Sequence, residues 1–331
     1  MLRFDDIRSH EIPRHTLQAA IQRQKVAHAY LFAGPPGVGK RKVAEALFGA
    51  LLCERGGTQA CFECAACKRY EAGVHQDYRV MEADGRFIKI EQVRDLSRLV
   101  HYPPIEGRFK CILIVDAENL HESAANALLK TLEEPSSSTV FVLLTTRAHL
   151  LLPTIVSRCQ QVRFAALDRA TVASLLMEKK QVASEVAHTV AAMSDGNMER
   201  AFVLLDSDLL AYRTEWMDRL VKLPTASVSD MLLWAELATA EKDRWEPVVE
   251  LLRLFVRDVM LVAAGIPPDQ LTYREFLPQL IEWSRKISVH SAINLLDLIL
   301  GAYRVTQFNA NPKLMMEHLF LQISACFSDD V

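Results

Sequence analysis

The stretch "AGPPGVGKRKVAEAL", residues Ala33–Leu47, decides what fold to expect for this chain. It satisfies the pattern G-x-x-x-x-G-K, follows a predicted strand and opens a predicted helix, which is the context that a phosphate-binding loop requires. The glycines let backbone N–H groups close around phosphate oxygens, and the lysine neutralises the β and γ phosphates. A glycine-rich turn without a ligand is the alternative. We predict a nucleotide-binding α/β domain that holds ATP or ADP at Gly34, Pro35, Gly37, Gly39, Lys40 and Arg41.

Two residues that ATP hydrolysis needs are missing from this pattern. Arg41 stands where a Ser or Thr hydroxyl normally binds Mg²⁺, and a guanidinium cannot coordinate a cation. Asp116 ends the run "ILIVD" as the metal-side acid should, but Ala117 replaces the Glu that polarises the attacking water. Losing a general base typically removes about 10²- to 10⁴-fold in rate. We expect Glu118 to point to another face, so the sequence predicts nucleotide binding without hydrolysis.

Short β-branched runs alternate with helical patterns between residues 30 and 164, which is typical of a parallel sheet with helices on both faces. We predict a five-stranded α/β P-loop module over residues 1–165, a small helical lid over 166–206 and an all-α C-terminal domain over 207–331. The predicted strands are Tyr30–Gly34, Tyr78–Glu82, Cys111–Asp116, Thr139–Thr145 and Gln160–Phe164.

Helical periodicity fills most of the remaining chain. One apolar stripe, which Pro103-Pro104 ends, consists of Val93, Leu96, Leu99 and Val100. Residues Asp168–Leu205 predict three short helices, the last two separated at Asp195-Gly196. Longer amphipathic helices are predicted over Val289–Val305 and Pro312–Phe327.

Four of the seven cysteines crowd into residues 53–67, in the pattern C-x7-C-x2-C-x2-C. In a cytosolic protein such clustering favours metal over disulfide, because thiols there are kept reduced. Four protein ligands leave no open position, so a zinc ion here would be structural. Redox pairing is the alternative, and we expect His75 to be an ordinary loop histidine rather than a ligand. The predicted zinc ligands are Cys53, Cys61, Cys64 and Cys67.

Composition restricts the classes of function. The 331 residues are 50% hydrophobic with a net charge of -3, and no run reaches the roughly 18 apolar residues that a membrane span needs. The N-terminus "MLRFDDIRSHEIPRH" is too charged for a secretory signal, so we expect a cytoplasmic protein without membrane association. No basic field covers the chain, and any contact with DNA is expected to be local or shared with partners.

Two arginines are candidates for stabilising phosphate charge. Arg158 lies in "SRC", just before the last predicted strand, and Arg200 lies in "DGNMERAF" on the predicted lid. Arginine presents a rigid fork of donors that suits phosphate, and Arg158 is placed to act on nucleotide held by a neighbouring subunit. A solvated or helix-capping arginine is the alternative at both positions.

Six motifs occur together along the chain: the phosphate loop, the four-cysteine insertion, "ANALLKTLEEP" (Ala125–Pro135), "LLTT" (Leu143–Thr146), "SRC" (Ser157–Cys159) and the G-x-x-x-R-A motif (Gly196–Ala201). Their order is the one found in bacterial clamp-loader AAA+ subunits of DNA polymerase III, and the chain resembles that family. The specific motifs cover about residues 1–205. The C-terminal helices fit the collar domain of that family less distinctively.

The resemblance implies that the chain is one subunit of a five-membered ring. That ring also contains gamma/tau ATPase subunits and a delta subunit, and it places a sliding clamp on primed DNA. Arg41 and Ala117 fit a stator-type member better than an ATP-hydrolysing motor, which is the alternative; an unrelated P-loop regulator or kinase with a zinc knuckle is a third possibility. A stator has no polymerase or ATPase activity of its own and lends its "SRC" arginine, here Arg158, to the neighbouring ATP site. Thr145 or Thr146 matches the sensor threonine, and Arg200 matches the lid sensor arginine.

Overall fold

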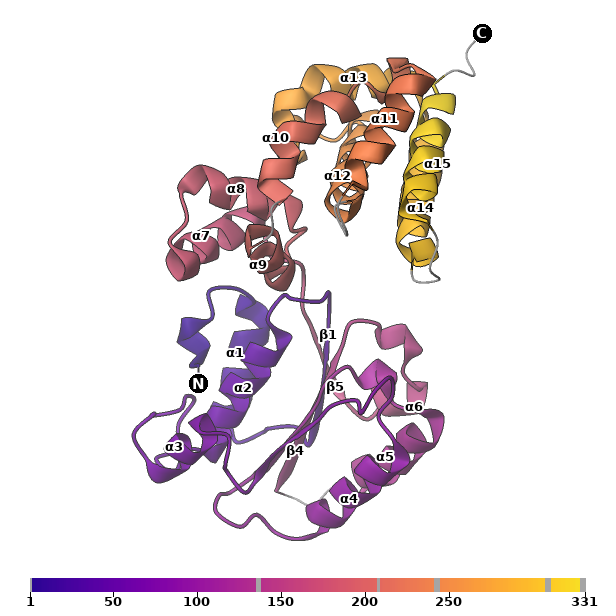
Figure 1. Ribbon diagram of the computed structural model, residues 1–331. Coiled ribbons are helices and arrows are strands. Elements are labelled where there is room, and N and C mark those ends of the chain that lie inside the picture. Colours follow the sequence, from indigo (N-terminus) through magenta and orange to yellow (C-terminus); the bar gives the residue numbers. More distant parts are fainter. Residues whose placement is uncertain (1, 135–137, 207–208, 241–244, 307–310, 328–331) are drawn as a thin grey trace. The chain divides into compact units, whose positions relative to one another are not determined.

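The computed structural model describes residues 2–134, 138–206, 209–240, 245–306 and 311–327 (Figure 1). Two compact units make up the chain. The first comprises Met1–Leu175 with Asp195–Glu199, and the second comprises Leu176–Ser194 with Arg200–Val331. The predicted lid is thus shared between the two units, and its boundaries as a separate domain stay a prediction. Pro135, the last residue of the "ANALLKTLEEP" motif, lies outside the described residues.

The first unit is built on a five-stranded parallel sheet with strand order β2-β3-β4-β1-β5. All five predicted strands are confirmed, with ends that differ by at most two residues. Because β1 lies between β4 and β5, the segment that leaves β1 emerges beside the ends of both neighbours. The strands are β1 Ala29–Ala33, β2 Tyr78–Met81, β3 Lys110–Ile114, β4 Thr139–Thr145 and β5 Gln160–Arg163.

Helices cover both faces of this sheet, with α1 and α2 on one side and α4, α5 and α6 on the other (Figure 1). Strands β1, β3 and β4 are buried on both faces, so their sequences are nearly continuous apolar runs. The helices of this unit are α1 Glu11–Gln22, α2 Lys40–Leu52, α3 Ala65–Glu71, α4 Ile90–His101, α5 Glu122–Glu133 and α6 Pro153–Val156, with short 3-10 turns at Phe4–Asp6, Ala117–Asn119 and Ala148–Leu150.

Helix α4 corrects one detail of the predicted stripe. Val93, Leu96 and Val100 are buried against the sheet and α5, as predicted, but Leu99 is 45% exposed. At about 100° of rotation per residue Leu99 lies at the margin of the stripe, beyond Leu96, where the neighbouring helix no longer covers it.

The second unit is helical. The three short helices predicted over residues 168–205 and the two long C-terminal helices are confirmed. Among the described residues, none of the helices has the length and apolar character of a membrane span. Its buried core includes Phe255, whose ring contacts the rings of Tyr273 and Trp283. The remaining helices are α7 Arg169–Lys180, which begins in the first unit, α8 Ser184–Met193, α9 Met198–Asp206, α10 Leu209–Leu220, α11 Val228–Ala238, α12 Trp245–Ala263, α13 Leu277–Lys286, α14 Val289–Thr306 and α15 Pro312–Ala325, with 3-10 turns at Leu223–Thr225, Pro268–Gln270 and Arg274–Phe276.

Candidate functional site

The phosphate loop lies between the end of β1 and the start of α2, where its glycines take conformations that other residues rarely adopt. Gly37 and Gly39 have φ of 65° and 100°, and α2 begins directly at Lys40. Lys40 is 8% exposed, and its Nζ donates to the carbonyl oxygens of Gly34 and Pro35 at 2.7 and 2.6 Å. A Cβ added at Gly39 would meet no atom within 4 Å in the part of the chain that the structure describes. The loop is therefore formed, open above the helix start and suited to a phosphate group.

Two further segments hold this loop, and the sequence analysis predicted neither contact. His10 lies 2.8 Å from the carbonyl oxygen of Val38 through Nε2, and the backbone N–H of Met198 donates to the carbonyl of Gly37 at 3.0 Å. A Cβ at Gly37 would lie 1.6 Å from Oδ1 of Asn197, so only glycine permits this approach. Asn197 could have been suspected from its place in the G-x-x-x-R-A motif, whereas His10 carries no sequence signal.

Arg41 is engaged by carboxylates at the position of the missing hydroxyl. Its Nη1 lies 2.8 Å from Oε1 of Glu82, and its Nε lies 3.1 Å from Oε1 of Glu45. The side chain of Arg41 is half exposed. Both ion pairs direct the guanidinium at protein carboxylates, and the guanidinium itself cannot coordinate a divalent cation.

Glu118 lies in the site, so the expectation that it points to another face was wrong. Asp116 adopts the left-handed conformation (φ 49°, ψ 56°), and the 3-10 turn that follows it directs Glu118 back toward the end of β4. There Oε1 of Glu118 accepts hydrogen bonds from the backbone N–H and the hydroxyl of Thr146, at 3.1 and 2.6 Å. The Glu118 side chain is 2% exposed, and its Oε2 has no hydrogen-bond partner among the described residues.

Charges in the site act strongly on one another. Burial lowers the pKa of Lys40, and the nearby carboxylates of Glu118, Asp116 and Glu199 oppose this, with Glu118 the strongest. Burial and the charge of Glu118 raise the pKa of Asp116. Burial alone would raise the pKa of Glu118, but the hydrogen bonds it accepts, above all from the Thr146 hydroxyl, outweigh burial and lower it. Glu118 is thus ionised at neutral pH.

The other predicted residues are distributed over the two units. Thr145 is fully buried at the end of β4, and its hydroxyl oxygen accepts from the N–H of Arg147 at 3.0 Å. Arg158 contacts Glu133 of α5 at 2.6 Å and the carbonyl of Thr154 at 3.1 Å, and its side chain is 35% exposed. Arg200 belongs to the second unit, where it pairs with Glu250.

The four clustered cysteines converge on one point. Their sulfur atoms lie within 4.8 Å of one another, which is compatible with a tetrahedral four-thiolate zinc site. Backbone N–H groups of Cys64 and Glu63 donate to the sulfur of Cys61 and lower the pKa of its thiol to about 6. His75 is not part of this group: it is 1% exposed, and its Nδ1 accepts from the N–H of Asp77 at 3.1 Å.

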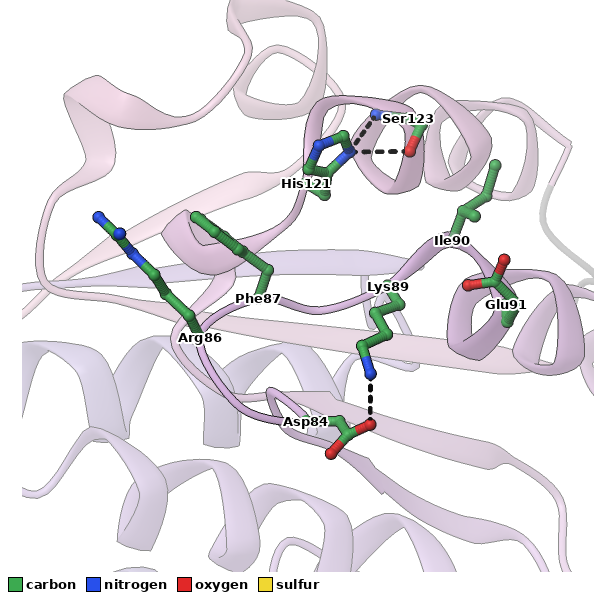
Figure 2. A pocket seen from close by; sticks show the side chains of 8 residues that line it. All are labelled: Asp84, Arg86, Phe87, Lys89, Ile90, Glu91, His121 and Ser123. Carbon is green, nitrogen blue, oxygen red and sulfur yellow. Dashed lines mark hydrogen bonds and ion pairs between the residues drawn. The ribbon is translucent and has the colours of Figure 1, made fainter.

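A separate pocket of about 350 Å³ lies between the starts of α4 and α5 (Figure 2). Lys89 pairs with Asp84 at 2.7 Å, and the guanidinium of Arg86 lies 5.2 Å from the centre of the Phe87 ring. His121 begins α5 and contacts Ser123. The carboxylates of Asp84 and Glu91 also line the pocket and balance the charges of Arg86 and Lys89. The sequence analysis did not single out this pocket, since its residues form no motif.

Comparison with known proteins identifies the family. The family model described as "DNA polymerase III, delta subunit" matches residues 10–168. The delta-prime subunit of Bacillus subtilis DNA polymerase III is 30% identical over 317 residues, which cover 93% of this chain and 94% of that one. The chain belongs to the delta-prime family of DNA polymerase III subunits. Its strand order and phosphate loop make it an AAA+ α/β module followed by a helical C-terminal region.

The chain is similar to further delta-prime subunits and also to tau subunits of DNA polymerase III. The delta-prime subunit of Pseudomonas aeruginosa is 47% identical over 142 residues, covering 42% of this chain and 43% of its own length. The tau subunit of Bacillus subtilis is 30% identical over 355 residues, covering 97% of this chain and 61% of its own length. Over nearly the whole chain, the Bacillus subtilis delta-prime and tau subunits are thus equally similar to it, and the site residues must separate the two types.

Proposed function

We propose that this chain is a non-hydrolytic stator in a bacterial DNA polymerase III clamp loader, which helps to place the sliding clamp on primed DNA during replication. One observation carries the proposal: the phosphate site lacks both the metal-binding hydroxyl and the water-polarising carboxylate. Arg41 is tied to Glu45 and Glu82 where a metal-binding hydroxyl is required, and the fully buried methyl of Ala117 replaces the water-polarising carboxylate.

The phosphate loop still suits ATP or ADP as a structural ligand. Backbone N–H groups between Gly34 and Lys40 would surround the phosphates, and Nζ of Lys40 would exchange its contacts with loop carbonyls for phosphate oxygens. When bound, the nucleotide supplies negative charge that stabilises this conformation of the loop. Asp116, Thr145, Thr146 and Arg200 are the further candidate contacts.

Arg158 acts on ATP held by the adjacent gamma/tau subunit rather than in its own site. It lies just before β5, is partly exposed, and is oriented by Glu133, so its guanidinium is presented at the surface with a fixed direction. Such a fork stabilises the charge that develops on a transferring phosphoryl group. Gamma/tau and delta subunits complete a five-membered ring.

The remaining parts serve assembly. A structural zinc held by Cys53, Cys61, Cys64 and Cys67 orders the insertion, residues 166–206 form the lid, and residues 207–331 form the collar through which the ring associates. Because a chain of net charge -3 carries no basic field, its contact with DNA is local or shared with its partners. The complex is cytoplasmic.

Steady-state ATP turnover by the purified chain alone, with Mg²⁺, tests the proposal. We expect turnover equal to that of Lys40→Ala, which removes the phosphate-binding lysine and sets the background. Sustained turnover that disappears in Lys40→Ala would identify the chain as a motor subunit, the alternative that the intact lysine and the tau relatives favour.

A further inference from the structure

The phosphate site contains a buried carboxylate that nucleotide hydrolysis does not call for. Glu118 is one residue beyond the position of a water-polarising glutamate, yet the turn at Asp116 brings it to the end of β4. Its side chain is 2% exposed, and Oε2 lacks a hydrogen-bond partner among the described residues. This oxygen is a buried anionic acceptor that the described part of the chain leaves without a hydrogen bond.

The partners of Glu118 include groups that a terminal phosphate would use, and Nε of Arg147 lies 3.8 Å from the same oxygen, Oε1. The hydroxyl and N–H of Thr146, one of the two threonines that match the sensor motif, donate to Oε1 at 2.6 and 3.1 Å. Lys40 is the residue expected to contact the β and γ phosphates. The charge of Glu118 raises the pKa of Lys40 more than the charge of Asp116 does. Carboxylate and phosphate oxygens are both anionic acceptors, so one can take the other's place.

We propose that Glu118 is a built-in anion that takes the place of the terminal phosphate, and that it makes this site select nucleoside diphosphates over triphosphates. A diphosphate ends within the loop, beside Lys40. A third phosphate brings its charge against the Glu118 carboxylate and competes for Thr146, where little water is present to screen the repulsion. This inference rests on the part of the proposed function in which the loop holds a nucleotide, and it is independent of the role of Arg158.

Equilibrium titration with ADP and with ATP, in EDTA and at neutral pH, tests the selectivity. We expect the full chain to bind ADP about tenfold or more tightly than ATP, which is the order of effect that one like charge at close range produces. Glu118→Gln keeps the size and the acceptor for Thr146 but removes the charge. It should tighten ATP binding by about tenfold while changing ADP binding by no more than about twofold. The matched control Glu122→Gln, which removes an exposed charge from the start of α5, should behave as wild type.

The ratio of the two affinities in the wild-type chain gives a result that does not depend on how any variant folds. Equal affinities for ADP and ATP would overturn the inference, as would a Glu118→Gln variant that shifts both nucleotides equally, or absence of binding by both proteins. ATP turnover by the chain alone would contradict the stator role and leave this inference standing, because the inference depends only on that ratio.

Discussion

Glu133 holds Arg158 at the surface through a 2.6 Å contact, while the carbonyl of Thr154 receives a second donor of the same guanidinium. An arginine that must reach a neighbour's nucleotide gains from such orientation, because less side-chain entropy is lost when it engages phosphate. The contact is partly exposed, so its effect on the stability of this chain is small.

We expect Glu133→Gln to lower ATP turnover by the assembled clamp loader several-fold, and less than Arg158→Ala does. The amide can still accept a hydrogen bond from Arg158 but no longer forms an ion pair, so orientation is weakened rather than abolished. Turnover assays on the reconstituted complex measure this effect. Glu134→Gln, at the adjacent exposed position, serves as the matched control, and an equal loss in both variants would refute the positioning role.

Asp77 is a fully buried carboxylate outside the nucleotide site. It accepts hydrogen bonds from the N–H groups of Ile105, Glu106 and Gly107, at 2.7, 2.7 and 3.0 Å. Burial raises the pKa of Asp77, but these three donors outweigh it and hold the pKa below its ordinary value. A depressed pKa in the folded state stabilises the protein above the unfolded pKa, and this contribution is lost as pH falls through the folded value.

Asp77→Asn should therefore reduce the free energy of unfolding by about 1–3 kcal/mol at pH 7, because an uncharged amide replaces an acceptor of three hydrogen bonds. The difference between wild type and variant should shrink below pH 4. Urea unfolding of both proteins at pH 7 and at low pH provides the measurement. A difference that does not change with pH would show that the charge of Asp77 contributes nothing.

At the scale of elements, α3 depends on contacts outside itself. It spans only Ala65–Glu71, and isolated helices of that length are unstable in water. Cys64 caps its first turn, the Tyr70 hydroxyl donates to the carbonyl of Glu45 at 3.1 Å, and Arg69 pairs with Glu106 at 2.7 Å. Cys64 and Cys67 belong to the four-cysteine cluster, so a bound metal ion would also link the start of α3 to Cys53 and Cys61.

Protein purified without chelator should contain about one zinc per chain, and Cys64→Ser should lose most of it. We expect faster hydrogen exchange over residues 53–72 in the variant, with the parallel sheet unchanged. Elemental analysis and hydrogen exchange report the two effects separately. Cys326→Ser, at an exposed cysteine in the helical unit, is the control and should retain the metal. Metal-free wild type would contradict the zinc site.

The elements that the sequence predicts well are those governed by local pattern. Buried parallel strands such as Thr139–Thr145 are continuous apolar runs bounded by polar turns, so their limits were predicted almost to the residue. Contacts made by tertiary structure were not predictable: His10 reaches Val38 across the fold, and Glu118 enters the site because Asp116 adopts a left-handed conformation. Neither single-residue backbone conformation nor long-range approach leaves a periodic signal.

At the scale of the whole molecule, relatedness does not decide between stator and motor, because delta-prime and tau relatives are each 30% identical over nearly the whole chain. The decision lies in a few positions of the site, where Arg41 and Ala117 replace groups that hydrolysis requires. A stator has two separable properties: its own phosphate loop is dispensable for turnover, and its surface arginine is not.

Turnover by the complex reconstituted with its ATPase subunits tests both properties in one assay, with Arg158→Ala and Lys40→Ala introduced separately into this chain. An arginine finger contributes about 10³- to 10⁵-fold at the site it serves, so Arg158→Ala should silence one site and lower total turnover. Lys40→Ala should leave turnover unchanged, as should the control Arg163→Ala at an exposed position of β5. The reverse pattern, with turnover lost in Lys40→Ala and retained in Arg158→Ala, would show that this chain is a motor and contradict the account.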